Sequence, residues 1–579
     1  MKHRKTVKRV LEYIRPYGFK IIEMLILAVI TVAFTLYTPI LIGRGVDYIV
    51  GPGEVWSEKL FKILLQLGVV ILGTAVSQWL MNLITNQVTY RVVQDIRSRA
   101  FCHLQEVPVS YMDASQPGDI LSRIVADVSQ FSDGLLMGFT QLFTGVVTIL
   151  GTIGFMLSIS VKISLLVIVL TPVSLFVASF IAGRTFRMFK EQSEKRAEMT
   201  SLVEEIVGNQ KLVQAFHYEE RAEKRFGKVN EELRVCGIKA LFFSSITNPS
   251  TRFVNGLVYT GVGIMGAFTV LSGRMTVGQL TSFLNYANQY TKPFNEISGV
   301  VAELENALAC ANRIFEFIDT QAEKPDGKDA VTMEHAEGEV KLTNLSFSYQ
   351  PEVSLLQDIN IHVKPGQRIA IVGPTGCGKT TIINLLMRFY DPQKGQIAVD
   401  GTPALKITRD SLRKNFGMVL QDTWLKAGTI RENIAYGKPD ASLEEVMEAA
   451  KKAHAHSFIR RMPKGYDTVI SEGGGNISQG QKQLLCIARV MLMRPSVLIL
   501  DEATSSIDTR TEVKVQKAFE ELMEGRTSFI VAHRLSTIQE ADLILVMKDG
   551  NIIEQGRHRE LLEKKGFYAH LYESQFAVS

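Results

Sequence analysis

Residues 373–380 read Gly-Pro-Thr-Gly-Cys-Gly-Lys-Thr and directly follow the apolar run Arg-Ile-Ala-Ile-Val at 368–372. This pattern is typical of a phosphate-binding loop between a buried strand and a helix. Its glycines let backbone N–H groups approach phosphate oxygens, Lys379 can neutralise the β- and γ-phosphates, and the Thr380 hydroxyl can ligate Mg²⁺. By itself the loop fits many ATPases and GTPases. Its predicted nucleotide-binding positions are Gly373, Pro374, Thr375, Gly376, Cys377, Gly378, Lys379, Thr380 and Thr381.

The first half of the chain is built to cross a lipid bilayer. Crossing about 30 Å of hydrocarbon takes about 20 predominantly apolar residues. Five segments meet that length, and a more polar sixth completes a predicted all-α, six-helix transmembrane domain over residues 1–320. The spans are expected at about 20–43, 60–86, 134–158, 162–184, 244–273 and 277–303.

The distribution of basic residues predicts which side of the membrane each connection occupies. Basic residues crowd the first nine positions and the stretch 184–239, and the positive-inside rule assigns both to the cytoplasm. The long amphipathic connections 86–133 and 184–239 then lie inside. We expect their turns, near 107–118 and 207–218, to contact a cytoplasmic motor. The predicted location is the cytoplasmic membrane, crossed several times.

The composition excludes several alternatives. A formal net charge of +5 over 579 residues does not call for nucleic acid as a partner. The five cysteines have no regular spacing, so we expect reduced thiols with no disulfide framework and no metal site. The first apolar run has no small-residue cleavage site and is long enough to remain as a membrane span.

Two polar stripes run along the last two predicted spans. A charged side chain facing lipid at mid-depth costs about 2.5–3.5 kcal/mol, so these stripes must face water or protein. They could line a substrate pathway, or they could join helices through hydrogen bonds. Lys292 and Glu296 extend the second stripe. The candidate pathway residues are Asn248, Arg252, Asn255, Tyr259, Asn285, Asn288 and Gln289.

Residues 321–339 are polar, carry no apolar periodicity and form the predicted linker. From 340 to 579 strands alternate with helices, which indicates an α/β domain with a parallel core. The apolar run 497–500 predicts a buried strand that ends in Asp501 and Glu502. Asp501 suits the Mg²⁺ site, and Glu502 suits polarising the water that attacks a γ-phosphate. His533 follows another apolar strand and could sense that phosphate.

The roles suggested for Asp501, Glu502 and His533 gain support from a further motif. About twenty residues before the Asp-Glu pair, the chain reads Ile477-Ser478-Gln479-Gly480-Gln481. This stretch resembles the signature motif of ATP-binding cassette (ABC) proteins, usually written L-S-G-G-Q. In the family's order, Tyr349 resembles the adenine-stacking aromatic, Gln421 the Q-loop, residues 505–508 the D-loop and His533 the switch histidine. The first 320 residues are similar to the membrane domain of exporter-type members, so the resemblance spans nearly the whole chain.

The resemblance implies a role for each of these residues. Glu502, His533 and Gln421 are the expected catalytic residues, and Thr380, Gln421 and Asp501 the Mg²⁺ ligands. In this family two nucleotide domains clamp ATP between them, so the signature of one chain binds ATP held by the other. A chain with one cassette is then half a transporter and must dimerise. Besides the loop, the expected ATP contacts are Tyr349, Ser478, Gly480, Gln481 and Asp508.

The signature departs from the family's pattern, because Gln479 replaces its first glycine and Ile477 its leucine. In heterodimeric exporters of this family one ATP site is impaired. An intact catalytic set with an altered signature is what the subunit of the competent site would carry, so we expect a heterodimer that exports an amphipathic compound, lipid or peptide. A homodimeric flippase-type exporter is the alternative, and an ATP-gated channel a further one.

Overall fold

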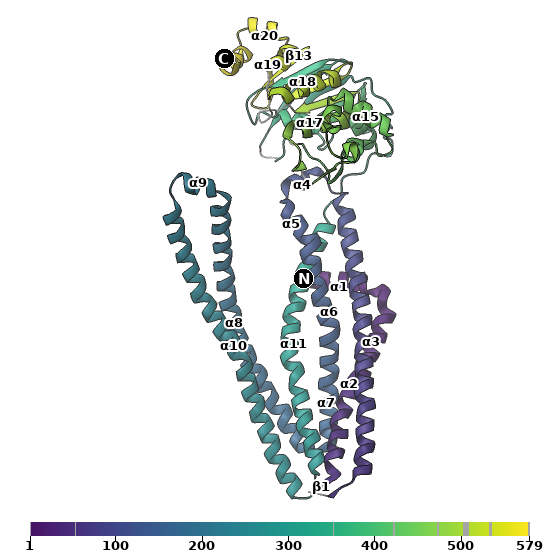
Figure 1. Cartoon of the computed structure of the whole chain (residues 1–579), viewed down its shortest axis with the longest axis vertical. Helices are drawn as coiled ribbons and strands as arrows, with labels where there is room; N and C mark the ends of the chain where they lie inside the picture. The colour runs from purple at the N-terminus through teal and green to yellow at the C-terminus, as the bar shows by residue number, and fades with distance from the viewer. Residues whose placement is uncertain are drawn as a thin grey trace. The chain divides into compact units, whose positions relative to one another are not determined.

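The computed structural model describes residues 2–51, 54–350, 353–420, 423–471, 474–501, 509–531 and 535–576. The chain divides into two compact units. Unit 1 comprises residues 1–106 and 115–321, and unit 2 comprises residues 107–114 and 322–579. The short helix α4 (Val109–Ala114) therefore belongs with the second unit, although it lies in the sequence between helices of the first (Figure 1).

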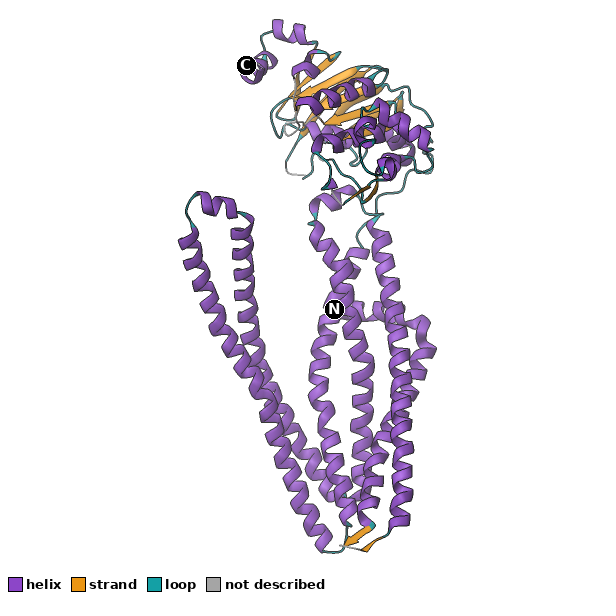
Figure 2. Ribbon diagram, in the orientation of Figure 1, coloured by secondary structure: helices purple, strands orange, loops and turns teal. Residues whose placement is uncertain are grey.

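Unit 1 is a bundle of long helices (Figure 2). Each of the six predicted spans falls on a helix: α2, α3, α6 with α7, α8, α10 and α11. A single turn of wider helix, η3, interrupts the third span, and a second such turn, η2, precedes α6. The helical elements are α1 (Lys2–Ile14), η1 (Arg15–Tyr17), α2 (Gly18–Asp47), α3 (Ser57–Leu104), α5 (Pro117–Ser122), η2 (Arg123–Asp127), α6 (Val128–Met137), η3 (Gly138–Leu142), α7 (Phe143–Ile159), α8 (Val161–Gly208), α9 (Gln210–Ala215), α10 (Glu219–Leu271) and α11 (Val277–Ile318).

Length and composition qualify four helical stretches of the described chain as membrane spans: Arg4–Asp47, Ser57–Leu104, Pro117–Ile159 and Glu219–Leu271. The spans predicted on α8 and α11 remain predictions. The expectation of an all-α domain needs one correction. Strands β1 (Ile49–Gly51) and β2 (Glu54–Val55) form a small antiparallel hairpin between α2 and α3. The hairpin was not predicted, because strands of only two or three residues leave no periodic pattern in the sequence.

Small residues and buried polar pairs hold unit 1 together. A side chain on Gly43 would clash with the carbonyl of Gly278, so α2 and α11 can approach closely only because glycine stands at both positions. Further along α11, Arg313 makes two hydrogen bonds, of 2.8 and 2.6 Å, to the buried carboxylate of Asp127 in η2. Helices α8 and α10 pack along each other as a long hairpin whose tip is α9 (Figure 1).

Unit 2 contains a six-stranded sheet and a four-stranded antiparallel one. The first has the order β14-β13-β5-β12-β11-β8, with only β14 antiparallel, and the second has the order β4-β3-β6-β7. The predicted α/β nucleotide-binding fold is confirmed. The strands are β3 (Val340–Phe347), β4 (Leu356–Val363), β5 (Arg368–Val372), β6 (Lys394–Val399), β7 (Thr402–Pro403), β8 (Phe416–Val419), β9 (Gly428–Thr429), β10 (Val469–Ile470), β11 (Val497–Asp501), β12 (Thr527–Val531), β13 (Leu543–Lys548) and β14 (Asn551–Gly556).

Helices cover both faces of the six-stranded sheet (Figure 2). The helical elements of unit 2 beyond α4 are α12 (Lys379–Leu386), η4 (Ala404–Lys406), α13 (Arg409–Lys414), α14 (Ile430–Ile434), η5 (Ala435–Gly437), α15 (Leu443–Lys452), α16 (His456–Ile459), η6 (Gly465–Asp467), α17 (Gln479–Met493), α18 (Thr509–Met523), α19 (Leu535–Gln539), α20 (His558–Glu563) and α21 (Phe567–Phe576).

Alternate side chains of each central strand enter two separate cores, as the pleat requires. In β5, Ile369 and Ile371 join the core that contains α12 and the antiparallel sheet. Ala370 and Val372 join the core formed with α15, α17 and α18. The helix after the phosphate loop and the helix after the signature motif therefore cover opposite faces of one sheet.

The segment that follows α11 is held against unit 2 by ion pairs. Asp326 pairs with Arg388 at 3.4 Å and with Arg409 at 2.8 Å, and Glu323 pairs with Arg409 at 3.2 Å and with Arg413 at 3.3 Å. The side chain of Arg388 is only 6% exposed and also donates to the carbonyls of Ala404 and Ile407. We call the three arginines with Glu323, Asp326 and Asp391 the linker clasp.

Candidate nucleotide site and membrane cavity

The phosphate loop has the geometry that binding a triphosphate requires. Gly376 and Gly378 have φ of +83° and +99°, conformations that side-chain-bearing residues rarely adopt. A side chain on Gly373 would lie 2.3 Å from the carbonyl of Met547. Gly378 precedes the first turn of α12, whose N–H groups point to the loop, and Lys379 Nζ donates to the carbonyls of Gly373 and Pro374 at 2.8 and 2.9 Å. The donor set therefore fits an anionic phosphate chain.

Cys377 lies inside this loop and is almost fully buried. Burial raises the pKa of its thiol, while the nearby Lys379 ammonium lowers it to a smaller extent. The thiol therefore stays protonated at neutral pH and adds no negative charge where phosphates would bind. Of the described residues, no group of three His, Cys, Asp or Glu side chains could hold a metal ion.

Three neighbouring parallel strands end at the edge of the sheet that carries the phosphate loop. Asp501, Val531 and Ile371 lie side by side in register on β11, β12 and β5. Asp501, one predicted Mg²⁺ ligand, is half-buried at the end of its strand. The other predicted catalytic and metal-binding positions, Glu502, Asp508, His533 and Gln421, lie outside the described residues. The strands that precede Glu502 and His533 are thus adjacent at this edge.

Tyr349 is 46% exposed, so its ring can stack on a base. Two other rings hold it edge-on, those of Phe347 and Tyr390, with centroids 5.0 Å from its own. Its hydroxyl accepts a hydrogen bond from the Asn384 amide of α12 at 3.0 Å. The sequence did not single out Tyr390 or Asn384 as supports of this ring, because both lie about forty residues away in the chain.

Tyr390 also links this ring cluster to α4. Its hydroxyl donates to the Asp113 carboxylate at 2.5 Å, inside unit 2. Burial, with the adjacent Asp113 carboxylate, raises the pKa of Tyr390 well above its usual value, so the phenol remains a donor. The segment around 107–118, which the sequence marks as a turn that contacts the motor domain, thus lies against the residues that support Tyr349.

The signature motif forms the amino-terminal end of helix α17. Ser478 is the N-cap of α17, where its hydroxyl accepts from the Gln481 N–H at 3.4 Å and its own N–H donates to Gln481 Oε1 at 3.1 Å. The predicted contact Gln481 is therefore engaged within its own chain, while Gly480 is buried. The unusual Gln479 donates to the Thr423 hydroxyl at 3.2 Å. This substitution thus connects the signature to the segment that follows Gln421.

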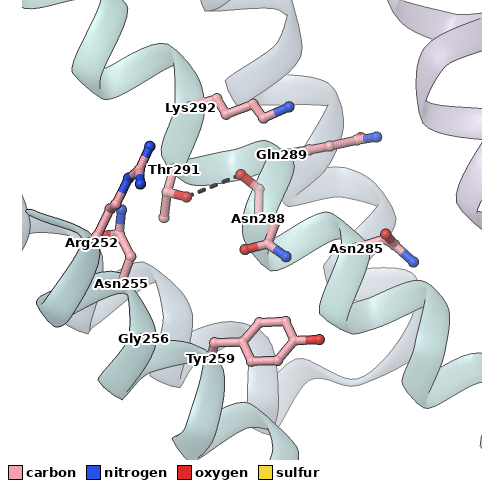
Figure 3. A pocket seen from close by; sticks show the side chains of 9 residues that line it. All are labelled: Arg252, Asn255, Gly256, Tyr259, Asn285, Asn288, Gln289, Thr291 and Lys292. Carbon is pink, nitrogen blue, oxygen red and sulfur yellow. Dashed lines mark hydrogen bonds between the residues drawn. The ribbon is translucent and has the colours of Figure 1, made fainter. Parts of the chain in front are cut away.

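The two polar stripes of the membrane domain meet in one cavity of about 760 Å³ between α10 and α11 (Figure 3). Six of the seven predicted pathway residues line it. The side chain of the seventh, Asn248, lies outside the described residues. Gly256, Thr291 and Lys292 complete the wall, and only Lys292 was visible in the sequence stripe. The lining residues are Arg252, Asn255, Gly256, Tyr259, Asn285, Asn288, Gln289, Thr291 and Lys292.

Comparison with known proteins agrees with both halves of this description. Residues 21–294 match the model of the ABC transporter transmembrane region, and residues 356–505 match that of the ABC transporter family. The uncharacterized ABC transporter ATP-binding protein YfiC of Bacillus subtilis is 41% identical over 99% of this chain and 94% of its own length. The chain belongs to the ABC transporter family.

Other members of this ABC transporter family extend the comparison. A fatty acid ABC transporter ATP-binding/permease protein of Mycobacterium tuberculosis is 38% identical over 91% of this chain and 82% of its own length. The structure of a bacterial Atm1-family ABC exporter with ATP bound is similar with a TM-score of 0.77 and 28% identity, covering 98% of this chain and 99% of the other. The protein is thus a membrane-embedded ABC exporter whose ATPase activity is coupled to transport.

Proposed function

We propose that this ABC transporter is one half of a dimeric exporter that moves an amphipathic compound out of the cytoplasm by alternating access. The observation that carries the proposal is the placement of two phosphate-binding elements in unit 2. The loop at 373–380 and the signature at 477–481 precede helices that cover opposite faces of the same sheet. Such an arrangement suits two chains that each offer the signature to ATP held by the other.

The tip of the α8–α10 hairpin supports a second chain as partner. Val207, Leu212 and Phe216 lie at this tip and are 68%, 55% and 78% exposed. Apolar side chains gathered in this way mark a protein contact rather than a solvated surface. We assign the tip to the partner's nucleotide-binding unit, so that ATP-driven closure reaches α8 and α10 as well as the helices joined by α4.

Each nucleotide-site residue has a proposed role. Lys379 and the loop N–H groups hold the phosphates, Tyr349 stacks on adenine, and Mg²⁺ would be held by Thr380, Asp501 and Gln421, neutralising phosphate charge. Glu502 orients and polarises the attacking water, His533 senses the γ-phosphate, and Asp508 with Ser478, Gly480 and Gln481 completes the shared interface. The same proposal places the amino terminus and unit 2 in the cytoplasm.

Replacement of the water-polarising carboxylate tests the catalytic part. Glu502→Gln keeps the shape of the side chain but removes its charge, and positioned bases of this kind contribute about 10²–10⁴ in rate. We expect ATP hydrolysis to fall by that factor while ATP binding is retained, as measured by phosphate release and by binding of a fluorescent ATP analogue. Unchanged turnover would rule out Glu502 as the catalytic residue.

We further propose that the partner is a different chain. Gln479 in the signature supports this, because an altered signature beside an intact catalytic set fits the competent-site subunit of a heterodimer. The purified chain alone should then have little ATPase activity, and addition of a second half-transporter should restore it. Substrate-stimulated ATPase activity of this chain by itself would instead establish a homodimer.

A further inference from the structure

We infer that the cavity between α10 and α11 selects an amphiphile with an anionic head group, an inference that rests on the proposed export function. Two of the nine lining residues, Arg252 and Lys292, carry a positive charge, and none carries a negative one. They come from different helices, so the charge belongs to the cavity rather than to one helix face (Figure 3).

Neither cation has a carboxylate partner among the described residues. Across the residues that the structure describes, Arg252 and Lys292 make no ion pair, and the side chain of Glu296, one turn beyond Lys292, lies outside that part. Elsewhere in unit 1, Arg313 is paired with Asp127. Arg252 and Lys292 are both exposed, so their charges are accessible to a ligand. A bound anion would supply the missing counter-charge.

The polar groups around the two cations add a second recognition element. The amide oxygens of Asn255 and Gln289 are buried and have no hydrogen-bond partner among the described residues. An unsatisfied buried polar atom is costly, so a ligand that donates hydrogen bonds to these oxygens gains affinity. The carboxamide groups of Asn285 and Asn288 lie in the same wall. The site therefore fits a head group that combines an anionic oxygen with hydrogen-bond donors, rather than a purely apolar one.

The same cavity has room and surface for an apolar tail. Its volume of about 760 Å³ lies within the usual range for sites of small organic ligands. The Tyr259 ring lines it and is 41% exposed. An apolar tail can therefore contact the Tyr259 ring while its head group lies between Arg252 and Lys292.

Binding of a matched probe pair tests this inference. The full-length chain is reconstituted in nanodiscs of zwitterionic lipid, without nucleotide, and titrated with dansylated undecanoate or with its methyl ester while dansyl fluorescence is recorded. The two probes differ only in the carboxylate charge. We expect the acid to bind about tenfold or more tightly than the ester, which corresponds to one modest charge interaction. Equal binding of both probes would overturn the inference.

Variants locate the selectivity in the cavity. Arg252→Gln combined with Lys292→Gln should remove the preference for the acid and leave ester binding unchanged. Arg252→Lys combined with Lys292→Arg keeps both charges and should retain the preference. Arg274→Gln removes an exposed cation of unit 1 outside the cavity and should change nothing. Persistent acid preference in the doubly neutral variant would place the selecting group elsewhere and overturn the assignment.

Two further measurements distinguish the source of the anionic ligand and separate failure of this inference from failure of the export function. Nanodiscs that include an anionic phospholipid test the source of the anionic head group. If this lipid competes with the probe, the occupant is a bilayer lipid. If it does not compete, the occupant is a free carboxylate amphiphile. ATP hydrolysis is measured on parallel samples to which ATP and the second half-transporter have been added. If the acid preference is absent while Glu502-dependent hydrolysis persists, anion selection fails and the proposed export function stands.

Discussion

Two groups of basic side chains in this protein are used in opposite ways. In the linker clasp, Arg388, Arg409 and Arg413 each meet one or more carboxylates within 3.6 Å. In the membrane cavity, Arg252 and Lys292 meet none among the described residues. The clasp fixes the segment after α11 on the nucleotide-binding unit. The cavity keeps its charge available, which is the condition for binding a ligand.

The difference also explains why burial alone does not reveal a functional cation. Arg388 and Arg409 are far more buried than Arg252, yet their charges are balanced by Asp326, Glu323 and Asp391. Removing one partner of a buried pair is destabilising because it leaves an uncompensated charge. Removing an unpaired cation carries no such penalty. Stability measurements therefore distinguish the two groups.

The largest expected effect is that of Arg388→Ala. This change leaves Asp326 and Asp391 short of a counter-charge and frees the carbonyls of Ala404 and Ile407, so it should lower the free energy of unfolding by about 3–5 kcal/mol. Thermal unfolding of the detergent-solubilised protein measures it. The control is Lys406→Ala on the same surface, whose effect should stay within about 0.5 kcal/mol.

A smaller loss is expected for Asp326→Asn. The Arg409 N–H and guanidinium bond to different oxygens of Asp326, so the amide, which has one oxygen, keeps only one of the two hydrogen bonds. Arg388 and Arg409 retain Asp391, so the loss should be about 1–3 kcal/mol. Asp329→Asn, an exposed acid three residues further along the same linker, is the matched control and should be neutral. Equal effects of the two substitutions would show that the clasp does not hold the linker.

The smallest effect is expected in the cavity. Arg252→Gln and Lys292→Gln, alone or together, should change the free energy of unfolding by no more than about 0.5 kcal/mol, or raise it, because no paired group is lost. The same thermal unfolding assay applies. A loss as large as that of Arg388→Ala would mean that these two cations stabilise the fold, and the contrast between clasp and cavity would then be wrong.

The sequence predicted the parts whose chemistry is local. The phosphate loop is recognisable because only glycine tolerates the conformations at 376 and 378 and the approach at 373. The polar stripes on α10 and α11 were visible because a fixed helical period places residues 252, 255 and 259, or 285, 288 and 289, on one face. Six of seven predicted pathway residues line one cavity for this reason.

The supporting contacts were not predictable, because they join residues far apart in the chain. Neither Asn384 nor Tyr390 carries a local pattern that assigns it to Tyr349, and Asp113 reaches Tyr390 across 277 positions. The sequence predicted only a polar linker over residues 321–339, with no partner assigned to its charged residues. In fact, Glu323 and Asp326 bind arginines about 60 to 90 residues away. The charge of a loop residue does not indicate which distant residue will be its ion-pair partner.

Sequence by itself determined that this chain joins a membrane domain to a nucleotide-binding domain, because hydrophobic length and glycine spacing act over a few neighbouring residues. Tertiary structure alone decided which charged side chains form ion pairs that stabilise the fold and which remain available to bind a ligand. Arg388 and Arg252 are the same residue type, but Arg388 has a carboxylate 3.4 Å away, whereas Arg252 has no ion-pair partner among the described residues. That distance depends on how distant segments pack, which a one-dimensional pattern does not contain.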